Sequence, residues 1–231
     1  MPKPIIVFDL DGTLVDTAPD LLDSLNHCLS GVGIGRVDAS EIRRYVGFGS
    51  RVMIERAFAA HNRSLAESEL DRLQAIFLDH YTANMPGKSK PFDGVLAAIE
   101  RFHDAGYLTA VCTNKYEGLS RQLLEALKMT QLFECICGSD TFGHRKPDPR
   151  HLTDTISMAE GDPERAVMIG DSRTDIDTAK AAGIPVVAVD FGYTDQPVHV
   201  FEPSCVISHF DELTVKLSER LVLAAQGHTV T

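Results

Sequence analysis

The sequence of 231 residues contains no tryptophan and no long apolar run. The first apolar run, Ile5 to Phe8, is too short for the core of a signal peptide, and no later run approaches the roughly 18 residues of a membrane span. The five cysteines include no C-x-x-C pair, and none stands beside a histidine at zinc-finger spacing. We therefore expect an unprocessed, cytoplasmic protein with free thiols.

Positive charge is scarce as well, because 22 Lys and Arg residues stand against 33 Asp and Glu residues, for a net charge of −11. This balance argues against a protein that neutralises nucleic-acid phosphates or coats an anionic membrane, so we expect neither partner. Local cations can still bind a small anionic substrate. The sequence leaves open whether the protein is a monomer or a homodimer.

Strand and helix patterns alternate from residue 92 onward. Short β-branched runs predict strands, and the amphipathic stretches between them predict helices. The predicted strands are 5–8, 107–112, 135–137, 166–169, 185–189 and 205–207, and the predicted helices are 95–105, 117–128, 150–159 and 173–182. This alternation predicts an α/β fold with a parallel sheet that is covered on both faces.

Residues 16–87 break the alternation, because they carry successive helix patterns and no convincing strand. An apolar stripe of leucines predicts one helix from Thr17 to about Gly31, and the pair Ser64 and Glu67 has the spacing of a capping box that begins another. We predict an inserted cap domain of four helices.

The core would then consist of residues 1–15 and 88–231. Both ends of the insertion must pass between the two domains, so we expect hinges near Gly12 and Gly87.

Two acidic motifs follow predicted strands, where ligands bind in open parallel sheets. Asp9 and Asp11 are two apart in extended chain and therefore point the same way. This arrangement indicates a divalent metal, an acid/base pair or both, although a solvated turn explains D-x-D alone equally well. Asp171 and Asp175 are one helical turn apart, and Asp175 could instead cap the helix.

Two further segments offer groups that can hold a phosphate. Thr113 and Asn114 follow the strand that ends at Cys112, although such residues often only cap helices. Lys146 stands directly before Pro147 and Pro149, which stiffen the loop and could hold its ammonium group toward the same sheet edge, whereas a lone loop lysine is usually solvated.

The four segments stand in a fixed order, each beside a predicted strand end: D-x-D-G-T, Thr-Asn, Lys-Pro-x-Pro and G-D-S-x-x-x-D. With the helical insertion directly after D-G-T-L-V-D, they resemble the haloacid dehalogenase (HAD) superfamily over residues 4–193. The resemblance implies a Rossmann-like parallel sheet core of the HAD type and an inserted, small, all-helical cap domain.

The resemblance also implies the roles of these residues in a Mg²⁺-dependent phosphatase. Asp9 would be the nucleophile that forms an aspartyl-phosphate, and Asp11 the acid that protonates the leaving oxygen and then activates water. Thr113, Asn114 and Lys146 would hold the phosphoryl group.

The same family pattern implies a magnesium site. Mg²⁺ would be held by the Asp9 carboxylate, the backbone carbonyl of Asp11 and the Asp171 carboxylate, with Asp175 behind these ligands.

Three segments, residues 14–20, 46–49 and 191–193, are similar to phosphoglycolate phosphatases, which makes 2-phosphoglycolate the expected substrate. One departure is Tyr116, which stands where many of these enzymes have proline. In the cap, the turn with Gly47 and Gly49, together with Arg51, could meet a substrate carboxylate, although an ordinary turn with a solvated arginine explains the same pattern.

Rival activities differ in what they require. Dehalogenase relatives lack an aspartate at the position of Asp11, and phosphonoacetaldehyde hydrolases need a cap lysine, which is absent between Lys3 and Lys88. An inorganic pyrophosphatase, a sugar-phosphate mutase and a non-catalytic phosphate-binding module remain as alternatives.

Overall fold

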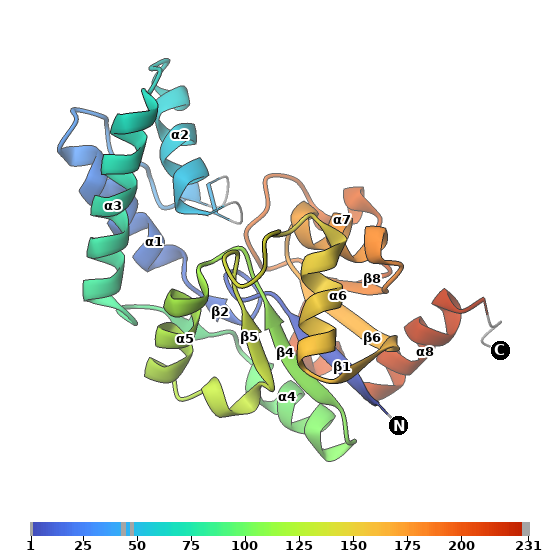
Figure 1. Cartoon of the computed structure of the whole chain (residues 1–231). Helices are drawn as coiled ribbons and strands as arrows, with labels where there is room; N and C mark the ends of the chain where they lie inside the picture. Colours follow the sequence, from blue (N-terminus) through green and yellow to red (C-terminus); the bar gives the residue numbers. More distant parts are fainter. Residues whose placement is uncertain (1, 43–44, 47–48, 228–231) are drawn as a thin grey trace.

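The computed structural model describes residues 2–42, 45–46 and 49–227, in which a sheet-based core lies beside a group of helices (Figure 1). The core sheet has six strands in the order β5-β4-β1-β6-β7-β8, and every neighbouring pair is parallel. The strands are β1 (Lys3–Phe8), β4 (Leu108–Cys112), β5 (Cys135–Cys137), β6 (Gly161–Gly170), β7 (Val186–Val189) and β8 (Cys205–Ile207). The predicted α/β fold is confirmed, and β6 begins earlier than the predicted start at residue 166.

Helices cover both faces of this sheet. Alternating residues of β1 separate the two layers, since Ile6 and Phe8 belong to one apolar cluster and Ile5 and Val7 to the other. The first face is covered by α4 (Val95–Asp104), α5 (Glu117–Ala126) and α8 (Val215–Ala225), and the second by α6 (Pro149–Met158) and α7 (Arg173–Ala182). Short 3-10 helices span Thr130–Leu132, Val198–Phe201 and Phe210–Glu212. We predicted no helix in the segment that forms α8.

The inserted segment forms its own apolar cluster. Its α-helices are α1 (Ala18–Ser30), α2 (Ser50–Ala60) and α3 (Glu67–Asn84), and Leu25, Phe58 and Phe77 lie at the centre of the cluster. Three α-helices are therefore present among the described residues of this segment, where we predicted four. This cluster, to which the core contributes Tyr193, supports our proposal that residues 16–87 form a cap domain distinct from residues 1–15 and 88–231.

The start of α3 differs from the prediction. The helix has Ala66 at its N-cap, so the predicted capping box with Ser64 as N-cap is wrong. Leu65 packs against the cap cluster and Ala66 keeps an extended backbone, which delays the first helical residue to Glu67.

The two connections between core and cap pair with each other. β2 (Val15–Asp16) and β3 (Lys90–Pro91) form an antiparallel ribbon, with Val15 opposite Pro91, that we did not predict. Gly87 lies in this second connection with φ +52°, and a Cβ there would lie 2.5 Å from an oxygen of Asp20.

None of the described helices is long and apolar enough to cross a membrane.

Asp20 anchors the second connection. Its buried carboxylate accepts hydrogen bonds from the backbone N–H groups of Lys88 and Ser89 and from the Ser89 hydroxyl. We expect Asp20→Ala to lower the free energy of unfolding by about 2–3 kcal/mol, because buried donors lose a charged acceptor. Urea denaturation measures this difference.

Asp23→Ala is the matched control for this prediction. Asp23 forms an exposed ion pair with Lys88, so its loss is expected to cost less than about 1 kcal/mol. Equal effects of the two substitutions would contradict the anchoring role of Asp20.

Candidate functional site

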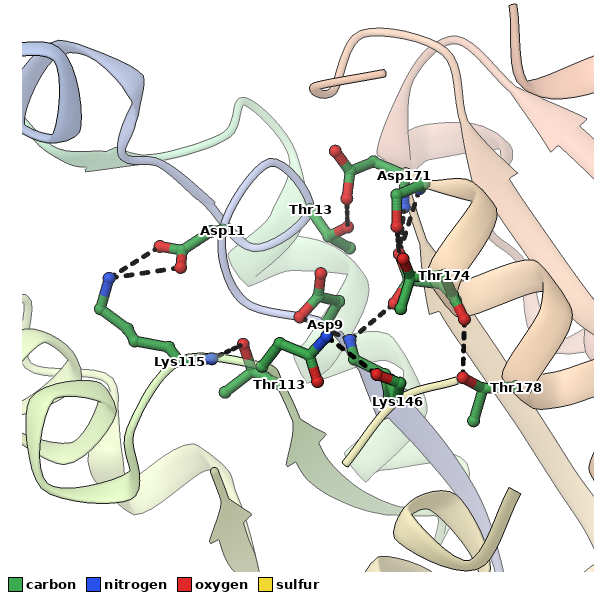
Figure 2. Close-up of polar contacts among 12 residues, drawn as sticks. Asp9, Asp11, Thr13, Thr113, Lys115, Lys146, Asp171, Thr174 and Thr178 are labelled. Atoms are coloured by element: carbon green, nitrogen blue, oxygen red, sulfur yellow. Dashed lines mark hydrogen bonds and ion pairs between the residues drawn. The ribbon is translucent and has the colours of Figure 1, made fainter. Parts of the chain in front are cut away.

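The site lies where three neighbouring strands end. β1 lies between β4 and β6, so the residues that follow these strands meet at one sheet edge. Asp9 follows β1, Thr113 follows β4 and Asp171 follows β6, and all three are buried. Figure 2 shows their side chains with Lys146 around one point. The structure therefore brings together residues from all four predicted segments.

Lys146 is the buried cation at this point. Its Nζ lies 2.9 Å from Asp9 Oδ1 and 2.6 Å from Asp175 Oδ1. Burial opposes the charged form, but the two carboxylates outweigh it and raise the pKa of Lys146 above its usual range. The Asn114 amide donates to the Lys146 carbonyl, so Asn114 holds the loop that carries the lysine.

Three buried carboxylates lie together here, and two of them contact the Lys146 ammonium group. Oxygens of Asp9, Asp171 and Asp175 all lie within 4.8 Å of one another. Burial raises the pKa of Asp9 to about 7, and burial with the nearby charges of Asp175 and Asp9 raises the pKa of Asp171 well above its usual value. An oxygen-rich cluster with uncompensated negative charge is the donor set that a hard divalent cation prefers, so the residues fit such an ion.

Hydrogen bonds fix the two aspartates that follow β6. Asp171 accepts from the Thr13 hydroxyl and from the Tyr193 backbone N–H. One oxygen of Asp175 accepts from the backbone N–H groups of Asp171 and Ser172, and the other contacts Lys146. Asp175 therefore caps α7 and also holds the lysine.

Gly12 allows this arrangement. Its φ is +86°, and a Cβ there would lie 2.3 Å from Asp171 Oδ2. Glycine at this position therefore lets the turn after β1 lie directly against the Asp171 carboxylate.

Asp11 faces a different partner from Asp9. Lys115 Nζ donates to both carboxylate oxygens of Asp11, at 3.1 and 3.2 Å. The side chain of Lys115 is only 6% exposed. In Figure 2, the Asp11 carboxylate points toward Lys115, whereas the Asp9 carboxylate lies near Lys146. We assigned no role to Lys115 from the sequence, although it stands directly after the Thr113-Asn114 pair.

A cleft lies between this site and the cap and opens to solvent. The core contributes Asp9, Asp11 and Thr113 to its lining, and the cap contributes apolar side chains such as Met53 and Phe77. The cleft therefore gives a ligand access to both domains.

The predicted cap contacts lie partly in this cleft. Gly49 and Arg51 line it, and Gly47 lies outside the described residues. The Arg51 guanidinium pairs with Glu67 and Asp71 of α3. Its charge is thus already balanced within the cap.

Comparison with known proteins places this arrangement in a family. Residues 6–189 match the model of the family described as "Haloacid dehalogenase-like hydrolase", and the chain belongs to this family of hydrolases.

Two curated relatives narrow the likeness to one group of enzymes. The chain is 67% identical to a phosphoglycolate phosphatase of Mesorhizobium japonicum, over 99% of this chain and 100% of the relative. It is 48% identical to a phosphoglycolate phosphatase of Agrobacterium fabrum, over 95% and 94% of the two chains.

A solved structure shows the same arrangement of elements. It is the crystal structure of a predicted phosphoglycolate phosphatase from Haemophilus somnus 129pt, which is 28% identical, covers 94% of this chain and 98% of its own, and has a TM-score of 0.86. The identification of the chain as a HAD superfamily member similar to phosphoglycolate phosphatases is confirmed.

A buried histidine supports the Lys146 loop. The backbone N–H of Lys146 donates to His151 Nδ1 at 3.2 Å, which requires a neutral ring with its proton on Nε2. Burial, together with the charge of Lys146, lowers the pKa of His151 to about 4. We assigned no role to any histidine from the sequence, because this contact depends on the folded loop.

The pKa of His151 predicts a pH dependence of stability. His151 binds a proton near pH 6.5 in the unfolded chain but only near pH 4 in the folded protein. The free energy of unfolding is therefore unaffected by the titration of this histidine above about pH 6.5, and it falls as the pH drops toward 4. Between pH 7 and 5 this loss is expected to be about 2 kcal/mol. Urea denaturation at several pH values should show a shallower dependence for His151→Asn, and identical slopes would contradict the assignment.

Proposed function

We propose that the protein is a Mg²⁺-dependent phosphatase that hydrolyses 2-phosphoglycolate to glycolate and phosphate. The observation that carries this proposal is the buried group of Asp9, Lys146 and Asp171 at the ends of β1 and β6, in a cleft that a small ligand can enter. The 67% identical relative named as a phosphoglycolate phosphatase supports the substrate. The site chemistry supports a phosphomonoester of any kind, so the substrate rests on the relatives.

In the proposed reaction, an Asp9 carboxylate oxygen attacks phosphorus, and the bond between phosphorus and the ester oxygen breaks. Asp11 gives its proton to the leaving oxygen, which departs as the hydroxyl of glycolate. Asp11 then accepts a proton from the water that attacks phosphorus in the aspartyl-phosphate. The bond between phosphorus and the Asp9 oxygen breaks, which releases phosphate and restores the Asp9 carboxylate.

Thr113 and Lys146 are proposed to hold the phosphoryl oxygens. The Thr113 hydroxyl oxygen already accepts from the Lys115 backbone N–H at 3.2 Å, which leaves its own proton free to donate to a ligand. Lys146 supplies a fixed positive charge beside Asp9 and reduces the repulsion between the anionic substrate and the nucleophile. Asn114 contributes by holding the Lys146 loop.

The carboxylates of Asp9 and Asp171 and the backbone carbonyl of Asp11 would hold Mg²⁺, with Asp175 behind them. When bound, the ion would neutralise charge on the phosphoryl group and on the buried aspartates. Hydrogen bonds from Thr13 and Tyr193 fix the Asp171 carboxylate beside Asp9 before any ligand arrives.

The cap is proposed to exclude water from the reacting atoms. Met53, Phe77 and Leu78 present apolar surface to the cleft, which strengthens charge interactions within it.

Replacing Asp9 tests the reaction. We expect Asp9→Asn to lower phosphate release from 2-phosphoglycolate by at least ~10³-fold, because an amide is a poor nucleophile. Asp190→Asn is the matched control, since Asp190 follows β7 at the same sheet edge and is exposed. Release would be measured for 2-phosphoglycolate, hexose phosphates, nucleoside monophosphates and pyrophosphate, each with Mg²⁺ and with EDTA.

A preference for pyrophosphate, or no release from any ester by the unmodified protein, would overturn the proposed function. Equal activity of Asp9→Asn and the unmodified protein would overturn the role of Asp9.

Thermal unfolding tests the metal site without an activity assay. At a Mg²⁺ concentration about 100 times its Kd, binding to the folded state should raise Tm by about 5–10 °C. We expect Asp171→Asn to abolish this rise. In EDTA at pH 8 the same variant should be more stable than the unmodified protein, because it removes a buried charge whose pKa is raised. A full Mg²⁺ response in Asp171→Asn would contradict the ligand assignment, and Asp190→Asn again serves as control.

A further inference from the structure

Lys115 places a buried positive charge at the border of core and cap. It follows β4 in the core, and its ammonium group lies 4.3 Å from the centre of the Tyr81 ring of α3 in the cap. The ammonium group also contacts both oxygens of Asp11 (Figure 2). Tyr81 is itself only 1% exposed, so the charge is enclosed by one carboxylate and one aromatic face.

The other cations that line the cleft differ from Lys115. Arg51 is paired with two carboxylates of the cap. Arg145 is exposed. Lys146, which contacts the cleft residue Asp9, is shared between Asp9 and Asp175. Within the described part of the chain, Asp11 is the only carboxylate that Lys115 contacts.

We propose that Lys115 is the residue that recognises the carboxylate of the substrate, and that it exchanges Asp11 for this carboxylate when the substrate binds. The inference rests on the proposed function, because it assigns the selectivity of the same site.

The dimensions of the substrate support this exchange. In 2-phosphoglycolate a single methylene separates the ester oxygen from the carboxylate carbon. Asp11 is proposed to protonate that ester oxygen, and Lys115 Nζ lies 3.1 Å from Asp11 Oδ1. A substrate carboxylate next to the ester oxygen therefore comes within reach of the same ammonium group.

The exchange links recognition to catalysis. While Asp11 is paired with Lys115, its carboxylate points away from Asp9 (Figure 2). A substrate carboxylate that takes the ammonium releases Asp11, which then takes up a proton from solvent and turns toward the leaving oxygen. A phosphoester without a carboxylate leaves the Asp11–Lys115 pair intact, so it is disfavoured both in binding and in turnover.

Tyr81 adds a contribution from the cap. Its ring face contacts the ammonium group as well, so the recognition site is complete only with α3 in place. The ammonium group lies over the ring face, 4.3 Å from its centre. Tyr81→Phe should therefore keep most of the selectivity, and Tyr81→Leu should lose part of it.

The test compares two substrates that differ only in the carboxylate. Ethyl phosphate has the two carbons of 2-phosphoglycolate with a methyl group in place of the carboxylate. The selectivity is the ratio of kcat/KM for 2-phosphoglycolate to kcat/KM for ethyl phosphate. It is measured for the unmodified protein, Lys115→Met and Lys115→Arg. Lys88→Met is the control, because it removes an exposed lysine that is paired with Asp23.

We expect Lys115→Met to lower the selectivity about 10- to 100-fold, the range for loss of a charge-assisted hydrogen bond. Lys115→Arg should restore part of it, and Lys88→Met should not change it. An equal fall of kcat/KM for both substrates in Lys115→Met would overturn the proposal, because Lys115 would then only position Asp11. A loss of selectivity in Arg145→Met instead would also overturn it.

Stability is controlled with a second pair of variants. If Lys115→Met does not fold, Asp11→Asn is compared with Asp11→Asn/Lys115→Met, which removes both charges of the buried pair. The dissociation constant for 2-phosphoglycolate, measured by calorimetry, should be at least about 10-fold larger in the double variant than in Asp11→Asn. The dissociation constant for ethyl phosphate should change less between the two variants.

Failure of the inference is distinct from failure of the proposed function. An unmodified protein that does not release phosphate from 2-phosphoglycolate overturns the proposed function. An unmodified protein that prefers 2-phosphoglycolate, with the same preference in Lys115→Met, overturns only the assignment of Lys115.

Discussion

The burial of three carboxylates around one lysine ammonium constrains the rest of the structure. Asp9, Asp171 and Asp175 would repel one another without Lys146, and a single cation does not balance them. The fold therefore supplies donors from several elements, including the Thr13 hydroxyl and the backbone N–H groups at the start of α7. These donors meet only because β4, β1 and β6 are neighbours in the sheet.

Short apolar runs followed by acidic or hydroxyl residues predicted most of the core and the groups of Asp9, Thr113 and Asp171 that meet at the sheet edge. These signals are local, because a buried strand and the residue after it are adjacent in the sequence. The β2–β3 ribbon and the contact of Lys115 with Asp11 could not be predicted in this way, since they join segments far apart in the chain. The capping box at Ser64 failed because packing of Leu65 outweighs a local preference. The order of strands also came only from the structure.

The two domains divide the work of the site unequally. The core holds the groups that are proposed to react, and each is fixed by contacts within the core, such as those of Asp175 and Asn114 with Lys146. The cap adds apolar surface and the ring of Tyr81, while Arg51 is balanced within the cap itself. Substrate selectivity in this arrangement depends on the border between the domains, where Lys115 touches both.

The pairing of Val15 with Pro91 has a consequence for how such proteins diversify. The chain leaves the core and returns to it at adjacent points. The insertion is therefore attached to the sheet in the same way as a long loop between two paired strands. Changes in the length or composition of the insertion leave the path of the core strands unaltered. A lineage can therefore replace the part that selects the ligand and keep the part that breaks the bond, and the two can evolve at different rates.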